Sequence, residues 1–417
     1  MMLYRLLISI FAGWVLLRLA LKGERTALRE RLGYARGAGA DVPHLWLHAA
    51  SNGELASARP LIEAWQRDRP DLPIVITCNS ESGVALARRM GLPAARAPLD
   101  LGRAVRRFCE AWQVAGHVAM EAEIWPNRFA CVPGPVALLG ARMSEGTART
   151  WGRFPRLARA TLGRVGYASA QDTGSRERLK ALGVPGQAFG PVVNLKVYYV
   201  PPQDVVPDDA LRAAFPPGET WLAASTHPGE DAIVLEAHRL ARQKRPDLRL
   251  ILAPRHPDRG AEIASEARAA GFETARRSIV EAPEGAAVYV ADTLGEMPLW
   301  YGLAGVVFIG GTLTDRGGHT PFEPAQFDAA LIHGLDTRNF AAPFETLDGN
   351  GGALAIRDAS GLAGALVSLG DPARRDGMAR RAEELLRPEA PLDAISADLG
   401  ALFPPSGGNA SRASEGA

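Results

Sequence analysis

Polar residues of the kinds that carry out chemistry gather directly after several apolar runs of this sequence. Five stretches show the pattern: HAASNGE (48–54), MEAEIWPN (120–127), STHPGE (225–230), PRHPDR (254–259), and ADTLGE (291–296) together with GGTLTDRGGHTPFEP (310–324). In open parallel sheets, ligands bind at the carboxyl ends of the strands. The pattern therefore predicts a site that is assembled from several strand ends.

Glu54 is the first candidate for acid–base work. It follows the apolar run LWLHAA and a glycine, and it begins an amphipathic segment that continues to Trp65. The dipole of a helix favours an ionised carboxylate at such a start, and an ionised carboxylate can take a proton from a hydroxyl group. The same position also suits a carboxylate that only caps the helix. The residues alone leave both interpretations open.

The stretch RGGHTPFEP (316–324) has the composition of a phosphate site. It places two glycines, a histidine, a threonine and a glutamate between a predicted buried strand and a predicted helix. Glycine lets the backbone turn sharply and approach a ligand, and the unpaired N–H groups of an opening helix suit an anion. We therefore predict that this stretch forms the floor of a nucleotide site.

Charge and metal-ligand spacing exclude other classes of protein. The 47 Lys and Arg residues nearly cancel the 46 Asp and Glu residues, which argues against a dedicated nucleic-acid binder. The three cysteines show no CxxC spacing, so we expect neither a zinc site nor a disulfide framework. Four histidines follow predicted strands without metal-ligand spacing: His48, His227, His256 and His319. We expect no metal.

The elements that must position these stretches form two similar series. From Leu45 onward, apolar runs alternate with helical patterns, which is typical of parallel sheets with crossover helices. We expect an α/β protein with two Rossmann-like domains facing a central cleft. The predicted segments are a membrane-associated segment 1–33, a first domain 34–200, a proline-rich linker 201–218, a second domain 219–403 and a disordered tail 404–417.

The N-terminal segment differs from the rest of the chain. A nearly uncharged run from Leu6 to Leu17 lies between Arg5 and Arg18, and a basic stretch follows it. The run is shorter than the roughly 20 apolar residues of a membrane span, and no small-residue cleavage site follows it. We predict an interfacial anchor on the cytoplasmic leaflet, with an ordinary buried first helix as the alternative.

The order and spacing of these stretches closely resemble the 3-deoxy-manno-octulosonic acid (Kdo) transferases of lipopolysaccharide assembly. The resemblance runs from the basic N-terminal segment through GARMSEGTAR (140–149) and ASAQDTGSRERLKALG (168–183) to DTRNF (336–340). It implies an inner-membrane-associated glycosyltransferase with the GT-B fold. It also implies inverting transfer of Kdo from CMP-Kdo to a lipid A precursor at the cytoplasmic face of the inner membrane, without metal or cofactor.

The resemblance assigns roles to three residues of the first half. Glu54 matches the general base of the family, and Glu121 matches a glutamate that stabilises the transition state, with Glu123 as a competing carboxylate. Lys196, in VNLKVY, matches a lysine with a similar stabilising role. Its charge can offset the negative charge that grows on the leaving phosphate. Outside the family, an acidic pair or a lone lysine in such a place is usually solvated.

The residues that match CMP-Kdo contacts lie in the second half: Pro254, Arg255, Leu294, Gly295, Glu296, Thr320, Pro321, Phe322 and Glu323. Arg255 can make a planar, charge-assisted contact to phosphate. We expect Glu296 and Glu323 to accept hydrogen bonds from the ribose hydroxyls.

This sequence departs from the family pattern at several positions: Asn52 for valine, Ala122 for threonine, Val193 for glycine, Leu294 for methionine, Thr320 for asparagine, Phe322 for leucine, and no aspartate after Lys196. Thr320 lacks the amide of asparagine, so altered donor contacts are expected. The alternatives are a GT-B enzyme for another nucleotide-activated acid sugar and a non-catalytic nucleotide-binding paralogue. The intact catalytic residues argue against the paralogue.

Overall fold

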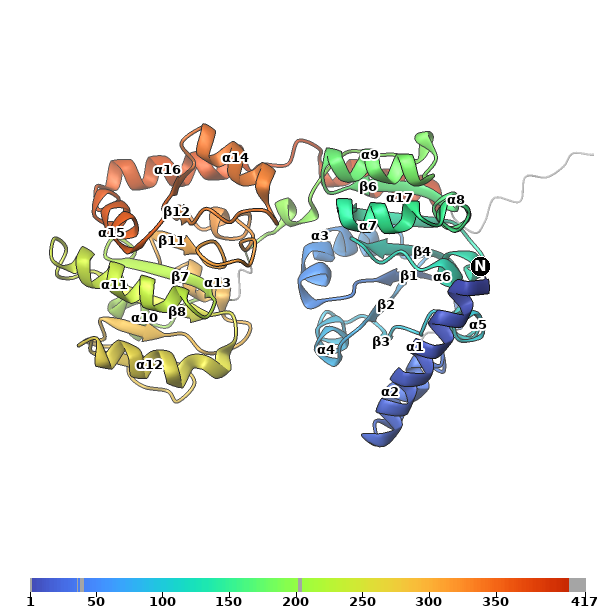
Figure 1. The fold of residues 1–417 in the computed structure, drawn as a ribbon, viewed down its shortest axis with the longest axis horizontal. Helices are drawn as coiled ribbons and strands as arrows, with labels where there is room; N and C mark the ends of the chain where they lie inside the picture. The colour runs from blue at the N-terminus through green and yellow to red at the C-terminus, as the bar shows by residue number, and fades with distance from the viewer. Residues whose placement is uncertain (1, 36, 38–40, 202–204, 405–417) are drawn as a thin grey trace, which may run out of the picture. The chain divides into compact units, whose positions relative to one another are not determined.

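The alternating apolar runs form parallel strands, as the sequence pattern predicts. The computed structural model describes residues 2–35, 37, 41–201 and 205–404. The chain divides into two compact units, each built on one parallel sheet with helices (Figure 1). Unit 1 runs to Tyr198 and resumes at Pro388, and unit 2 comprises Tyr199–Arg387. The prediction of two Rossmann-like α/β halves is confirmed.

Unit 1 contains a six-stranded sheet with the order β3-β2-β1-β4-β5-β6. Its strands are β1 (His44–His48), β2 (Ile74–Cys78), β3 (Ala94–Arg96), β4 (Val114–Met120), β5 (Val136–Ala141) and β6 (Val165–Ala170). The central strands β1, β2 and β5 are buried along their whole length, as expected for a sheet covered on both faces. β1 and β4 are neighbours with His48 opposite Ala119, so the segments after these two strands leave the sheet side by side.

The helices of unit 1 follow the predicted apolar periodicity. They are α1 (Met2–Leu21), α2 (Arg25–Arg31), α3 (Asn52–Asp68), α4 (Glu81–Arg89), α5 (Gly102–Ala111), α6 (Pro126–Cys131), α7 (Glu145–Gly152), α8 (Pro155–Leu162), α9 (Thr173–Leu182) and α17 (Leu392–Leu402), with the 3-10 turns η1 (Gly186–Ala188) and η2 (Leu195–Tyr198). In α3 the apolar stripe includes Leu55, Leu61 and Trp65, which are all buried.

The segment after residue 387 belongs to unit 1, so the predicted end of the second domain at residue 403 is corrected. Helix α17 packs against α3 and β6. Its buried Ile395 and Leu399, with Phe403, join the core that contains Trp65. Gly116 leaves the space that Phe403 fills, because a Cβ there would lie 2.1 Å from that ring. The predicted tail beyond residue 404 lies outside the described residues.

Helix α1 is longer than the apolar run from Leu6 to Leu17 that the sequence singles out. Residues Leu3–Leu21 are long and apolar enough to cross a membrane by length and composition, and most of this stretch is not buried in the protein. One side packs on unit 1 through Ile8 and Ala12, and the Tyr4 hydroxyl donates to Asp100 Oδ2 at 2.5 Å. The other side exposes large apolar residues: Leu3, Leu6, Leu7, Ile10, Phe11, Trp14, Leu17 and Leu21.

Unit 2 contains a seven-stranded sheet with the order β13-β12-β11-β7-β8-β10-β9. Its strands are β7 (Thr220–Thr226), β8 (Arg249–Pro254), β9 (Thr274–Arg276), β10 (Val288–Val290), β11 (Val306–Ile309), β12 (Ala330–His333) and β13 (Ala353–Ala355). Its helices are α10 (Asp209–Ala214), inside the predicted linker, α11 (Glu230–Arg242), α12 (Gly260–Ala269), α13 (Met297–Tyr301), α14 (Ala341–Gly349), α15 (Ala359–Ser368) and α16 (Pro372–Leu385), with the 3-10 turns η3 (Pro257–Arg259) and η4 (Pro324–Gln326).

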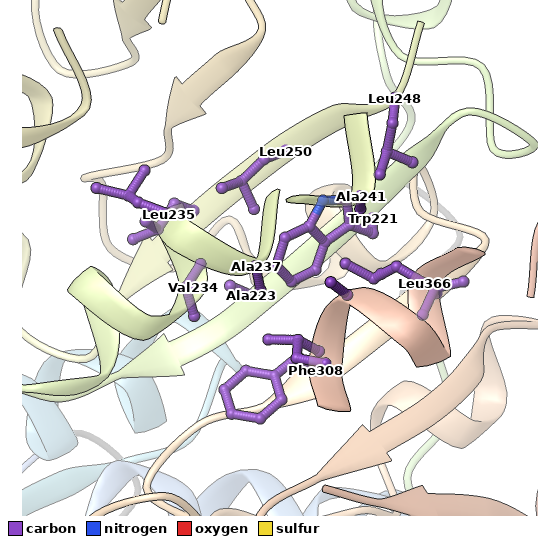
Figure 2. Close-up of a cluster of buried hydrophobic side chains, with 14 of the residues drawn as sticks. Trp221, Ala223, Val234, Leu235, Ala237, Ala241, Leu248, Leu250, Phe308 and Leu366 are labelled. Carbon is purple, nitrogen blue, oxygen red and sulfur yellow. The ribbon is translucent and has the colours of Figure 1, made fainter. Parts of the chain in front are cut away.

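Trp221 of β7 lies at the centre of the core of unit 2. Figure 2 shows its indole near Ala237 and Ala241 of α11 and Leu366 of α15. The indole is fully buried, and its Nε1 donates to His238 Nδ1 at 3.1 Å, so the buried polar group has a partner. This packing holds α11 and α15 against the sheet whose strands lead to the predicted CMP-Kdo contacts.

The helix predicted directly after Gly318 is wrong. Only the 3-10 turn η4 (Pro324–Gln326) follows in this stretch. Pro321 and Pro324 lack backbone N–H groups, and Pro321 disfavours the helical region for Thr320, so a helix cannot begin at the glycines. The predicted sharp turn is present, because Gly317 and Gly318 have φ angles of 80° and 76°.

Candidate active site

Three predicted catalytic residues are brought together in unit 1, at the ends of β1 and β4 and on η2. Lys196 Nζ lies 3.9 Å from Glu121 Oε1, and both side chains are 25% exposed. Glu54 lies near enough to Glu121 for the two charges to interact. We call Glu54, Glu121 and Glu123 with Lys196 the carboxylate cluster. A cluster of this composition can exchange a proton and stabilise developing charge.

Glu54 is held by the turn that begins α3. Its Oε2 accepts from the Ala50 backbone N–H at 2.8 Å, and its Oε1 accepts from the Ser51 hydroxyl at 3.2 Å. Ser51 Oγ accepts from the Glu54 backbone N–H at 3.2 Å, which caps the helix. The Glu54 carboxylate therefore stabilises the start of α3, as the capping interpretation expects, and this does not exclude a second role.

The electrostatic setting of Glu54 suits a base. Burial, followed by the negative charges of Glu121 and Glu123, raises the pKa of Glu54 to about 7, against the opposing hydrogen bonds from Ala50 and Ser51. A general base is most effective when its pKa lies near the working pH. The cap and a catalytic role are thus compatible in one side chain.

Glu121 has an unusual backbone conformation. Its φ angle is +46°, in the left-handed region that non-glycine residues seldom adopt. Such a conformation costs on the order of 1–3 kcal/mol and persists only where the surroundings impose it. Here the Glu121 N–H donates to Leu139 O at 2.9 Å, and Glu121 O accepts from Arg142 N at 3.2 Å. These bonds fix the backbone from which the carboxylate reaches Lys196.

Glu123, the competing carboxylate, is already engaged. Its Oε2 accepts from His48 Nε2 at 2.9 Å and from Trp125 Nε1 at 2.7 Å. Burial acts to raise the pKa of Glu123, but the hydrogen bonds from His48 and Trp125 outweigh it and lower that pKa to about 2. A carboxylate of such low basicity is a poor proton acceptor, so the environment separates the two candidate bases in favour of Glu54.

His48 is a neutral donor to this carboxylate. It is fully buried, and burial together with the charge of Arg128 lowers its pKa to about 4. Its Nδ1 lies 2.9 Å from both the backbone O and the Oγ1 of Thr77, and its Nε2 lies 2.9 Å from Glu123 Oε2. From the sequence, His48 is considered only as an unlikely metal ligand. Its position at the end of a strand is the one indication that it could contact the site.

The predicted donor-binding residues follow strands of unit 2. Pro254 ends β8 and Arg255 follows it, Leu294–Glu296 follow β10, and Thr320–Glu323 lie in the segment after β11. With β7, these three strands are contiguous and parallel, so their carboxyl ends share one edge of the sheet. We call this edge the donor edge.

Three histidines, His227, His256 and His319, and two arginines gather at the donor edge. The rings of His227 and His319 stack at 5.1 Å, with their Nε2 atoms 3.0 Å apart. Burial, followed by the charges of Arg316, His256 and Arg255, lowers the pKa of His227. Among the described residues, the side chains of Arg255 and Arg316 make no hydrogen bond or ion pair with protein. Such a cationic edge suits an anion.

The segment after β11 (residues 310–324) does not offer its backbone N–H groups to a phosphate, contrary to what the sequence predicted. Glu230, fully buried, accepts from the N–H groups of His227 at 2.9 Å, Gly311 at 2.7 Å and Leu313 at 2.9 Å. The Gly317 N–H donates to Asp336 Oδ2 at 2.7 Å, and that of Gly318 donates to Gly311 O at 2.8 Å. These donors are taken by the protein, so a phosphate would depend mainly on side chains.

The remaining donor-side residues have separate surroundings. Arg277 holds Glu296 through two hydrogen bonds of 2.7 and 3.1 Å, and the Thr293 hydroxyl also donates to Glu296. Leu294 is 80% exposed and precedes Gly295, whose φ is +85°. Pro254, Pro321 and Phe322 are buried, and the Phe322 N–H donates to Thr320 Oγ1 at 3.3 Å. Burial, followed by the negative charge of the nearby Glu323 carboxylate, raises the pKa of both Tyr199 and Tyr301. The described residues contain no metal-binding group of three or more His, Cys, Asp or Glu.

Comparison with known proteins gives consistent matches. A family model described as 3-Deoxy-D-manno-octulosonic-acid transferase (kdotransferase) matches residues 26–199. The chain is 33% identical to the 3-deoxy-D-manno-octulosonic acid transferase of Haemophilus influenzae, over 78% of each chain. It is also 33% identical to that of Bordetella pertussis, over 81% of this chain and 82% of the relative.

Solved structures show similarity in fold. UDP-GlcNAc 2-epimerase from Neisseria meningitidis matches with a TM-score of 0.59 at 12% identity, over 86% of this chain and 99% of that one. A glycosyltransferase from Rickettsia africae matches with a TM-score of 0.58 at 9% identity, over 87% of this chain and 97% of that one. At such identities the likeness shows the two-sheet α/β fold alone.

Proposed function

This chain belongs to the 3-deoxy-D-manno-octulosonic acid (Kdo) transferase family, and from that premise we propose that it transfers Kdo from CMP-Kdo to a lipid A precursor, with inversion at the anomeric carbon. It is a glycosyltransferase of lipopolysaccharide synthesis with the GT-B fold. The observation that carries the proposed mechanism is the half-buried Glu54 carboxylate, with a pKa near 7, beside the Glu121–Lys196 pair. The direct test is the formation of a Kdo-modified lipid with release of CMP.

In this mechanism Glu54 takes the proton of the acceptor hydroxyl as the hydroxyl oxygen attacks the anomeric carbon of Kdo. The bond from that carbon to the phosphate of CMP breaks, and its electron pair leaves with the phosphate. Lys196 offsets the charge that develops, and Glu121 holds the Lys196 ammonium in place. Glu123 and His48 maintain the local field without exchanging a proton.

On the donor edge, we propose that Arg255 binds the phosphate of CMP. Glu296 and Glu323 accept from the ribose hydroxyls, and Leu294, Gly295, Pro254, Thr320, Pro321 and Phe322 shape the surrounding surface. The unengaged guanidinium of Arg255 supports this assignment, because no ion pair with the described residues has to break before phosphate binds.

The pH dependence of turnover should report Glu54. The base acts only when ionised, and its pKa is raised from 4.5 to about 7, so kcat/KM should fall about tenfold per pH unit below roughly pH 7. Glu123, whose pKa is about 2, cannot produce a limb in this range. The measurement is a pH–rate profile of the unmodified enzyme, and an acidic limb at or below pH 5 would exclude Glu54 in the environment described.

Arg255→Ala should weaken CMP binding about tenfold or more, the scale of one charge-assisted hydrogen bond to phosphate. Isothermal titration of CMP into the full-length protein measures the effect. Arg239→Ala is the matched control, since Arg239 is an exposed arginine of unit 2 that pairs with Glu236 on α11. Equal CMP affinities of the Arg255 variant and the unmodified protein would place the nucleotide elsewhere.

We also propose that α1 holds the protein at the cytoplasmic face of the inner membrane. Its exposed apolar side and the basic residues of α2 support this location. Deleting residues 2–21 should move the protein into the soluble fraction and leave CMP affinity unchanged, because the donor residues belong to unit 2. Fractionation with CMP titration tests this, and a truncated protein that stays with the membrane or no longer binds CMP contradicts it.

A further inference from the structure

Arg128 of α6 is a buried cation without a matching anion. Its side chain is 2% exposed, and its Nε and Nη1 have no hydrogen-bond partner. The guanidinium lies 5.1 Å from the ring centroid of Trp46 and 5.9 Å from that of Trp125. Aromatic faces stabilise a cation only in part, and a buried charge normally requires an ionic partner. An anion is therefore expected beside Arg128.

The Asp100 carboxylate, which contacts the Arg128 backbone, is already used by other donors. Asp100 Oδ1 accepts from the backbone N–H of Arg128 at 2.6 Å. Its Oδ2 accepts from the Asn127 N–H at 2.9 Å and from the Tyr4 hydroxyl at 2.5 Å. No carboxylate of the described residues forms an ion pair with the Arg128 guanidinium. The protein thus supplies attraction from a distance but no direct partner.

Arg128 lines a cavity of about 180 Å³ under α1, and its wall also includes Arg31, Trp125, the α1 residues Phe11 and Val15, and the Asp100 carboxylate, whose two oxygens are taken by the donors named above. Arg31 is the second cation of this cavity. Its Nη1 donates to Ala97 O at 2.9 Å and its Nη2 to Asn79 O at 2.8 Å, which fixes the guanidinium. Burial, followed by the charges of Arg96 and Arg128, lowers the pKa of Arg31 to about 10. An anion would relieve the repulsion between the two arginines.

The walls of the cavity define the chemistry of that anion. Two guanidinium groups match a phosphate monoester, which carries nearly two negative charges and accepts planar, charge-assisted bonds, better than they match a fatty-acid carboxylate with one charge. Phe11 and Val15 belong to α1, whose outer side is apolar and exposed. A ligand with a phosphate and an apolar chain satisfies both surfaces.

We propose that this cavity binds the phosphate monoester group of a lipid, whose acyl chains lie along α1. Trp125 lines the cavity and also donates to Glu123, so the bound lipid would lie next to the carboxylate cluster. That the lipid is the acceptor of the transfer reaction rests on the proposed function. The binding of the phosphate itself does not.

The experiment measures binding to the full-length protein in a neutral detergent by isothermal titration, without CMP-Kdo. The probes are dihexanoyl phosphatidic acid, dihexanoyl phosphatidylcholine and inorganic phosphate. We expect phosphatidic acid to bind at least tenfold more tightly than either of the others. Equal binding of inorganic phosphate would overturn the lipid part of the proposal, and equal binding of phosphatidylcholine, whose phosphate is a diester, would overturn the preference for a phosphate monoester.

Two variants test the residues. Arg128→Met and Arg31→Gln should each weaken phosphatidic acid binding about tenfold or more, while Arg59→Ala, which removes an exposed ion pair of α3, should not. Arg128→Met should keep or raise the thermal unfolding midpoint, because it removes a buried unpaired charge. A lower midpoint with unchanged lipid affinity would show that Arg128 is structural, and unchanged affinity in Arg31→Gln would overturn the site even if Arg128→Met failed to fold.

Failure of the proposed Kdo transfer and failure of the proposed lipid site would give different results. If the protein did not transfer Kdo, phosphatidic acid would still bind in an Arg128-dependent manner. If the cavity did not hold a lipid phosphate, Arg128→Met and Arg31→Gln would bind phosphatidic acid as the unmodified protein does, whatever the transfer assay showed. The binding and transfer measurements therefore fail independently.

Discussion

Glu54→Gln is expected to lower turnover by about a hundredfold or more, the usual scale of general base catalysis, and to leave CMP affinity unchanged. The amide cannot take the proton of the acceptor hydroxyl. Glutamine serves at this position of a capping box as well as glutamate does, so the turn at Ala50 and Ser51 should survive. Initial rates with CMP-Kdo and a lipid A precursor measure turnover, isothermal titration measures CMP affinity, and the unfolding midpoint reports whether the turn survives.

Glu63→Gln is the matched control for this variant. Glu63 lies on the same helix, α3, and forms an exposed pair with Arg59, so its amide should leave turnover nearly normal. Near-normal turnover in Glu54→Gln would return that carboxylate to a purely capping role. Glu121 would then become the candidate base, since Glu123 is held at a pKa of about 2.

Lys196→Met is expected to lower kcat by about a hundredfold, with a smaller change in KM. Removal of one preorganised group that stabilises transition-state charge costs about a hundredfold to a thousandfold in kcat. Methionine keeps the unbranched shape of the side chain and removes the charge that lies 3.9 Å from Glu121. Steady-state rates at varied CMP-Kdo concentration separate kcat from KM.

The acid limb gives a second readout for Lys196. Loss of this cation leaves the negative charge of Glu121 unbalanced, so the pKa of Glu54 should rise further and the limb should move to higher pH. Lys180→Met, an exposed lysine of α9, is the control for loss of a charge. A Lys196 variant with raised KM, normal kcat and an unmoved limb would make Lys196 a binding residue only.

Much of the fold could be predicted, because apolar periodicity depends on local sequence. The runs LWLHAA and PIVITC became β1 and β2, and the stripe that ends at Trp65 became α3. The destination of α17 could not be predicted, because Ile395 and Leu399 show only that one side of the helix is apolar. Which core they join depends on space left by distant residues such as Gly116. Pro321 did carry the signal against a helix after Gly318.

The sequence could predict which residues form the candidate site better than it could predict the contacts that set their charge states. Glu121 and Lys196 are 75 positions apart in sequence, and resemblance placed both before the structure showed them as a pair. The engagement of Glu123 by His48 depends on the pairing of β1 with β4, which periodicity does not reveal. Likewise, the Gly311 N–H donates to Glu230, which lies 81 positions away in sequence. An unpaired buried Arg128 is a property of packing alone.

The central claim is that this protein transfers Kdo to a lipid with Glu54 as the base, and one measurement tests it most directly. Purified full-length protein is incubated with CMP-Kdo and a lipid A precursor, and the lipid is analysed by mass spectrometry and by NMR of the new linkage. The account predicts a lipid that carries Kdo in inverted linkage, one CMP released for each Kdo added, and almost no product with Glu54→Gln. Unmodified lipid after CMP-Kdo has been consumed, or transfer from a different nucleotide-activated acid sugar alone, would contradict it.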